Sequence, residues 1–141
     1  MKDVIEFKKI YNHSIEDVWD AISTKEGLSS WLMPCDIEAK IGNEFTFQTK
    51  PYPGFDGTVH CKVKELDPPN KIAYTWKAGN LDTIVTFKLS STQQGTILHF
   101  TQTGFKGLLN KLFAKQVLAR GWKRTLLNIK LKKYLDDARR I

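Results

Sequence analysis

The sequence has little that suits a membrane-embedded, exported or disulfide-linked protein. Its 141 residues include no apolar run of the roughly 18 residues that a membrane-spanning helix needs. The first nine residues alternate charged and apolar types and lack the apolar core of a signal peptide. The only two cysteines, Cys35 and Cys61, are expected to be reduced thiols in a cytoplasmic protein. This length predicts one domain spanning residues 1–141.

The sequence is also poor in the residue groups on which catalysis and metal binding depend. Its three histidines, His13, His60 and His99, are not spaced as a metal-binding pair, and no glycine-rich phosphate loop is present. Neither cysteine lies in a nucleophile motif. The adjacent carboxylates at 16–17 and 136–137 fall at the ends of expected helices, where acids are usually capping or solvated groups. We therefore expect no metal, no cofactor and no enzymatic activity.

Positive charge is concentrated near the carboxyl terminus. The net charge is +7, and residues 106–141 hold 11 of the 22 Lys and Arg residues but only 2 of the 15 Asp and Glu residues. Such a segment can bind an anionic partner, or it can form a solvated surface that keeps the protein soluble. Aromatic residues are not interleaved with the basic ones as in nucleic-acid-binding proteins, so no nucleic-acid partner is expected.

The first part of the chain predicts a strand followed by two short helices. Residues 4–11 look like a strand, although their irregular alternation does not show which face points inward. Ser14 followed by Asp17 is typical of a helix start, and this helix would bury Val18, Trp19 and Ile22. Thr24 can cap a second helix, which ends at Met33-Pro34 and carries Leu28, Trp31 and Leu32.

From residue 35 onwards, short alternating segments predict strands. Two are Cys35–Glu38 and Glu44–Gln48, and the inward residues of the next four would be Val59, Cys61, Val63, Ile72, Tyr74, Trp76, Val85, Phe87, Leu89, Leu98 and Phe100. Short turns join most of these strands, so neighbours should pair antiparallel. A Pro/Gly-rich loop covers residues 50–57.

Residues 106–140 predict one long helix. No proline interrupts them, and good helix formers dominate. One apolar stripe comprises Leu118, Trp122, Leu126 and Ile129, and a second comprises Leu127, Leu131, Tyr134 and Ala138. A helix with two apolar sides must lie in a concave surface, and only this helix is long enough to cover a twisted antiparallel sheet. The fold class is therefore α+β, with a curved antiparallel sheet around a long carboxyl-terminal helix.

A series of short motifs spans nearly the whole chain. They are Val18-Trp19-Asp20-Ala21, Leu28-x-x-Trp31, Gly57-x-Val59, the segments 67–72 and 83–87, Tyr74-Thr-Trp76, Gly95-Thr96-x-Leu98 and Gly121-Trp122. In this order they resemble the activator of heat-shock protein 90 ATPase homologue family, within the helix-grip (SRPBCC) superfamily of START lipid-transfer domains and birch-pollen-type allergens. The resemblance implies a helix-grip fold with an apolar cavity between sheet and helix. The chain departs from the family pattern at one point. Its closing pair, Tyr134-Leu135, lies about two residues further along the chain than the family pattern implies, which indicates a longer or bulged helix.

The aromatic residues are the candidate ligand-binding residues. The cavity wall would comprise Phe47, Tyr74, Trp76, Phe87, Phe100, Trp122 and Leu126, with Trp31, Tyr52 and Phe55 at a mobile rim. His99, Thr101 or Cys61 would add polar contacts if they face inward, although alternation favours solvent for His60 and His99. Each of these aromatic residues, taken alone, is more typical of a filled core. The binding hypothesis depends on all of them together.

Two functions from different classes follow. The first is non-catalytic binding of an apolar or aromatic small molecule, such as a lipid, a sterol or a polyphenol, by a monomer. The second, implied by the family resemblance, is a stress-related co-chaperone-like module acting on a chaperone ATPase. Its acidic partner would bind the basic helix face, made of Lys111, Lys115, Arg120, Lys123, Arg124 and Lys130. Some members of the superfamily are enzymes, but no acid–base pair in this sequence supports that alternative.

Overall fold

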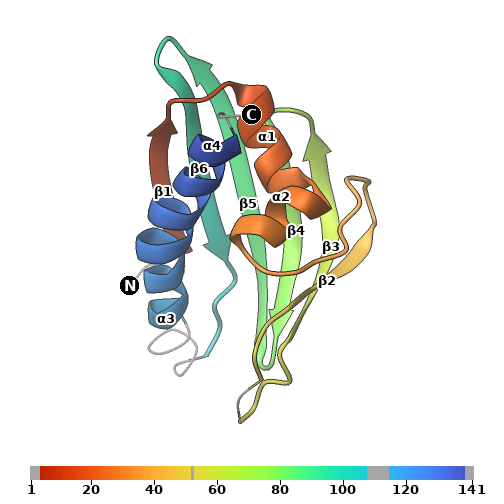
Figure 1. The fold of residues 1–141 in the computed structure, drawn as a ribbon. Coiled ribbons are helices and arrows are strands. Elements are labelled where there is room, and N and C mark those ends of the chain that lie inside the picture. Colours follow the sequence, from red (N-terminus) through yellow and green to blue (C-terminus); the bar gives the residue numbers. More distant parts are fainter. Residues whose placement is uncertain (1–3, 52, 108–114, 139–141) are drawn as a thin grey trace.

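The computed structural model describes residues 4–51, 53–107 and 115–138, which form one curved sheet with all helices on one face (Figure 1). The strands are β1 (Val4–Tyr11), β2 (Glu44–Gln48), β3 (Thr58–Asp67), β4 (Lys71–Ala78), β5 (Leu81–Thr92) and β6 (Gly95–Thr103). Their order across the sheet is β1-β6-β5-β4-β3-β2, with every neighbouring pair antiparallel. The predicted α+β helix-grip fold is confirmed.

The alternation of apolar residues correctly predicts which face of β3, β4, β5 and β6 is buried. Phe87 of β5 pairs directly with Phe100 of β6, and both side chains are buried beneath the helices. The predicted strand at Cys35–Glu38 is wrong, because only Cys35 pairs with β2, in an isolated bridge to Phe47. Further along, the carboxylate of Asp36 accepts the Thr46 N–H at 2.9 Å, so a side chain replaces the backbone partner that a strand would supply.

Two short helices, α1 (Ile15–Ser23) and α2 (Lys25–Trp31), follow β1 as predicted. The Ser14 hydroxyl accepts the Asp17 N–H, and the Thr24 hydroxyl accepts the Gly27 N–H, so both expected caps are present. Gly27 allows the two helices to approach closely, because a Cβ at this position would lie 2.6 Å from the Asp20 carbonyl oxygen.

The carboxyl-terminal helix is continuous over residues 115–138, but its middle is not an α-helix. It comprises α3 (Lys115–Arg120), the π-helix η2 (Gly121–Leu131) and α4 (Lys132–Ala138). The bulge implied by the late Tyr134-Leu135 pair is therefore present. No helix in the described part of the chain combines the length and apolarity that crossing a membrane requires.

The π-helix changes which side chains of the helix are buried. The buried residues are Trp122, Leu127, Leu131 and Leu135, whereas Ile129 is 62% exposed. In an α-helix, residues five apart lie about 140° apart around the axis, but the wider π turn brings Trp122 and Leu127 to one side. The predicted stripe ending at Ile129 is therefore wrong, since it assumed α-helical spacing throughout. Leu118 and Leu126 are only half-buried.

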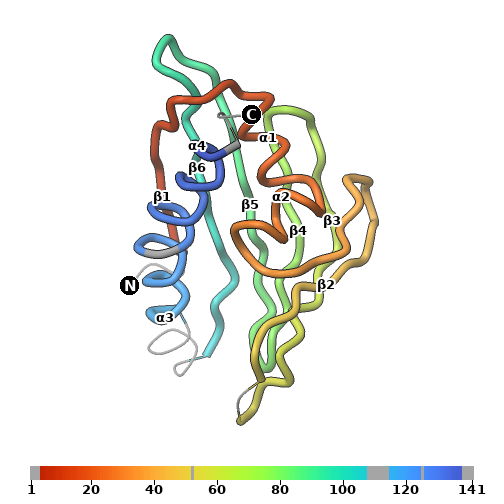
Figure 2. Tube along the Cα trace, in the orientation of Figure 1, coloured from red at the N-terminus to blue at the C-terminus, as the bar shows by residue number. Residues whose placement is uncertain are grey.

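Three alternating side chains near the amino terminus, two in β1 and one just after it, form hydrogen bonds with this helix. The Lys9 ammonium donates to Asn128 Oδ1 at 2.9 Å, and the buried Tyr11 hydroxyl donates to the Leu127 carbonyl at 2.8 Å. His13 Nε2 lies 2.8 Å from Asp136 Oδ1. The odd-numbered residues therefore face inward, and the amino-terminal segment and the helix lie side by side at this edge (Figure 2).

Acidification is expected to weaken the hydrogen bonds that Asp136 accepts near the end of the carboxyl-terminal helix. Hydrogen bonds from Lys132 and then His13 lower the pKa of Asp136. Because the pKa of Asp136 is lower in the folded protein, the ionised carboxylate stabilises the fold at pH values above the ordinary aspartate pKa, near 4. This stabilisation is lost as the pH falls below that pKa and through the lowered folded-state pKa. Thermal melts of wild type and Asp136→Asn should differ slightly at pH 6 and converge near pH 2. A difference that persists at pH 2 would contradict this assignment.

Candidate functional site

Seven aromatic side chains form one cluster between the sheet and the carboxyl-terminal helix. This aromatic cluster comprises Phe45 and Phe47 of β2, Tyr74 and Trp76 of β4, Phe87 of β5, Phe100 of β6 and Trp122 of η2. Each ring has a neighbour whose centroid lies 4.4 to 5.5 Å away, and Tyr74 and Phe87 form a further pair at 6.4 Å. Exposed fractions of 3% or less show that the cluster is shielded from solvent.

A chain of buried polar groups crosses one end of the aromatic cluster. The Trp122 indole N–H donates to Gln102 Oε1 at 3.0 Å, and Gln102 Nε2 donates to the Thr83 hydroxyl at 2.9 Å. That hydroxyl donates to the Trp76 carbonyl at 2.9 Å. The chain therefore fixes the Trp122 indole and links it through β6 and β5 to the backbone of β4.

Tyr74 contributes the one unsatisfied buried polar atom identified in the described part of the chain. Its side chain is fully buried, and no group there forms a hydrogen bond with its hydroxyl. Burial raises the pKa of Tyr74 well above its ordinary value, so the hydroxyl keeps its proton and can donate it. An unsatisfied buried hydroxyl destabilises a protein by about 1–3 kcal/mol, which makes this position a point where a bound molecule could add a contact.

Two buried thiols lie among the apolar residues of the same core. Cys61 is in β3, paired with Phe45, and Cys35 bridges to Phe47. Burial raises the pKa of both thiols, which keeps them protonated and poorly nucleophilic. No group of three metal-binding side chains is close enough to hold an ion among the residues that the structure describes. The two protonated thiols therefore act as small apolar side chains of the core.

The other predicted site residues are spread around the aromatic cluster. Trp31 is buried in α2 and its indole N–H donates to the Ala21 carbonyl, whereas Leu126 and Phe55 are half-buried against the core. Tyr52 and the basic residue Lys111 lie outside the described residues. Six of the ten predicted residues are therefore in contact, and their role in binding remains a prediction.

Of the predicted polar contacts, only Cys61 faces inward. His99 and Thr101 point to the outer face of β6, where His99 Nε2 lies 2.6 Å from the Glu6 carboxylate. Sequence reasoning missed Gln102 and Thr83, two buried polar residues that form the hydrogen-bonded chain to Trp122. The signal was available, because Gln102 continues the alternation of Leu98 and Phe100, and Thr83 precedes Val85 and Phe87 on the same face.

Comparison with protein families shows which family has this architecture. The model of the family described as Activator of Hsp90 ATPase homolog 1-like protein matches residues 12–136. The chain belongs to this family. The matched range includes α1, α2, five of the six strands and nearly all of the described carboxyl-terminal helix.

Solved structures with the same fold include proteins from three named organisms. Protein MLL2253 from Mesorhizobium loti is 26% identical, with a TM-score of 0.85 over 95% of this chain and 97% of that one. Protein BH1534 from Bacillus halodurans is 28% identical, with a TM-score of 0.78 over 94% and 96% of the two chains. An Aha1 dimer from Colwellia psychrerythraea shares the fold at 20% identity, with a TM-score of 0.74 over 90% and 92%. No curated protein matches the chain.

Proposed function

We propose that this family member binds a small, mostly apolar molecule between the sheet and the carboxyl-terminal helix, without catalysing a reaction on it. The helix-grip fold and the family support a binding module. The proposed site is the aromatic cluster together with the half-buried Leu126 and Phe55. Its composition, aromatic walls with a few fixed polar groups, is that of small-molecule sites in general.

The observation that carries the proposal is the unsatisfied Tyr74 hydroxyl. A core that serves only for stability would gain from phenylalanine at this position, because the ring would remain and the unsatisfied donor would disappear. A ligand with a hydrogen-bond acceptor, such as a sterol or polyphenol oxygen, would satisfy this donor while its apolar body contacts the surrounding rings. The rings are in mutual contact, so binding requires some of them to move apart.

The substitution Tyr74→Phe is expected to change stability and binding in opposite directions. The free protein should gain about 1 kcal/mol of unfolding free energy, since an unsatisfied hydroxyl is removed. Affinity for a lipid, sterol or polyphenol that perturbs the Trp122 indole signal should fall about tenfold, as expected when one hydrogen bond of about 1.4 kcal/mol is lost. Urea denaturation and fluorescence titration measure the two effects.

The matched control is Tyr11→Phe, the same chemical change at a buried tyrosine whose hydroxyl is already bonded to the Leu127 carbonyl. This variant should lose about 1 kcal/mol of stability. If Tyr74→Phe were destabilising to the same degree as Tyr11→Phe, the Tyr74 hydroxyl would have a partner in the free protein and the proposal would lose its main support.

A second candidate function is co-chaperone-like binding to an acidic protein surface, which the family description suggests. The observation that favours it is the outer face of the carboxyl-terminal helix. There Val117 and Ile129 are 70% and 62% exposed, and the exposed cations Arg120, Lys123, Arg124 and Lys130 are on the same helix. Salt-sensitive co-purification of a chaperone and a changed ATPase rate would support this function. An unchanged ATPase rate at saturating protein would exclude it.

A further inference from the structure

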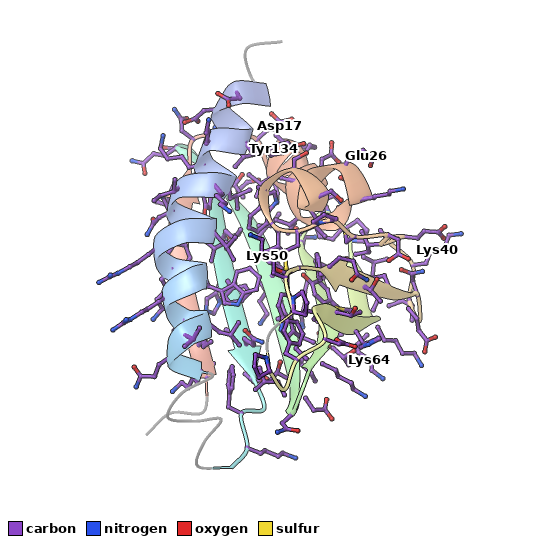
Figure 3. The ribbon with its side chains drawn as sticks, turned by 60° about the horizontal axis from the view of Figure 1, so that its bottom comes forward. Asp17, Glu26, Lys40, Lys50, Lys64 and Tyr134 are labelled. Carbon is purple, nitrogen blue, oxygen red and sulfur yellow. The ribbon has the colours of Figure 1, made fainter. Side chains whose placement is uncertain are left out.

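We propose that a groove between α2 and the end of the carboxyl-terminal helix is a second binding site, specific for an amphipathic carboxylate with a single alkyl chain. The groove has a volume of about 650 Å³, within the range of small-molecule sites. Its lining comes from two segments far apart in sequence and consists of Ser30, Trp31, Leu32, Lys130, Lys133, Tyr134 and Asp137. Figure 3 shows Tyr134 beside the α1–α2 pair.

The floor of the groove is apolar and fixed in place. Trp31 and Leu32 are only 2% and 8% exposed, so they present small apolar surfaces at the bottom of the groove. The Trp31 indole N–H is already bonded to the Ala21 carbonyl at 2.7 Å. The ring therefore has no donor left for a ligand, and it offers van der Waals contact to an alkyl chain.

The rim of the groove is cationic and has unused hydrogen-bonding capacity. Lys130 and Lys133 are exposed, and neither forms an ion pair within the described ranges 4–51, 53–107 and 115–138. Lys132 differs, because its ammonium bonds to Asp136 at 2.7 Å. Asp137 adds one negative charge to the rim, which leaves one net positive charge.

An apolar floor below a cationic rim fits a molecule that is apolar along its length and negative at one end. The carboxylate would accept hydrogen bonds from the two ammonium groups and the Tyr134 hydroxyl, while the chain would cover Trp31 and Leu32. A neutral alcohol of the same chain length would make the apolar contacts and at most weaker hydrogen bonds, because it lacks the negative charge that attracts the two ammonium groups. This site is separate from the aromatic cluster and does not depend on ligand binding there.

The test uses dodecanoate and dodecanol, each below the concentration at which it aggregates, with the indole N–H signals of the protein followed by NMR. Dodecanoate should shift the Trp31 signal saturably, and dodecanol should bind at least about tenfold more weakly. In Lys130→Gln/Lys133→Gln, affinity for dodecanoate should fall about tenfold. In the control Lys123→Gln/Arg124→Gln, which removes the same charge from the same helix outside the groove, affinity should remain within about twofold.

Three results would overturn the groove site. The first is a silent Trp31 signal, and the second is a shift confined to the Trp76 and Trp122 signals, which would mean that dodecanoate binds the aromatic cluster instead. The third is an equal loss in both double variants, which would indicate non-specific attraction. Tyr74→Phe should leave the dodecanoate affinity unchanged, so failure of the aromatic site and failure of the groove are distinguishable.

Discussion

Replacing Trp122 by alanine is expected to lower the free energy of unfolding by roughly 3–5 kcal/mol, the largest effect of any substitution considered for this protein. The indole is 1% exposed, and its ring centroid lies 4.4 Å from that of Phe100 and 5.5 Å from that of Trp76. Truncation would leave a cavity between helix and sheet and would remove the partner of Gln102 Oε1. Urea denaturation followed by far-ultraviolet circular dichroism measures the loss.

The comparison variant is Trp19→Ala, which truncates a half-buried tryptophan on α1, outside the aromatic cluster. Its loss should be clearly smaller, because less apolar surface is removed from the core. Trp122→Phe separates ring packing from the hydrogen bond to Gln102, since it keeps a ring while deleting the indole N–H. If a ligand of the aromatic cluster binds folded Trp122→Ala with unchanged affinity, the proposed pocket does not include this helix.

The second large effect is expected at Gln102. Substitution by leucine keeps a similar volume but leaves the buried Trp122 N–H without its acceptor, and it removes the donor to Thr83. A loss of about 2 kcal/mol is expected for the unsatisfied indole donor. The same measurement on Gln93→Leu, an exposed glutamine in the turn between β5 and β6, should show a change of no more than about 0.5 kcal/mol. A Gln102→Leu variant of unchanged stability would mean that the polar chain does not position the Trp122 indole.

Much of the sheet could be predicted because strand alternation depends on local sequence. Phe45, Phe47, Tyr74, Trp76, Phe87 and Phe100 occupy inward positions by period two, and all six are buried. The same rule applied to Gln102 and Thr83 would have placed them inside. They were missed because a polar residue on an inward position is easily assigned to solvent when its partners, 19 or 20 residues away, are unknown.

The carboxyl-terminal helix shows where local reasoning fails. The burial of Leu127 with Trp122, and the exposure of Ile129, follow from a π-helix, whereas propensities and spacing are evaluated for an α-helix. Only the late position of Tyr134-Leu135 indicated the bulge. The unsatisfied Tyr74 hydroxyl and the groove beside Trp31 depend on which side chains meet in three dimensions, and no pattern in the sequence encodes either directly.

The most direct test of the central claim is an NMR titration of the labelled protein with a library of lipids, sterols and polyphenols, in which the four tryptophan indole signals are followed individually. If a ligand binds between the sheet and the carboxyl-terminal helix, at least one compound should shift the Trp76 and Trp122 signals saturably. The Tyr74→Phe variant should bind that compound with weaker affinity. A well-dispersed spectrum in which no compound moves these two signals would contradict the account, and the aromatic cluster would then be a core that serves stability alone.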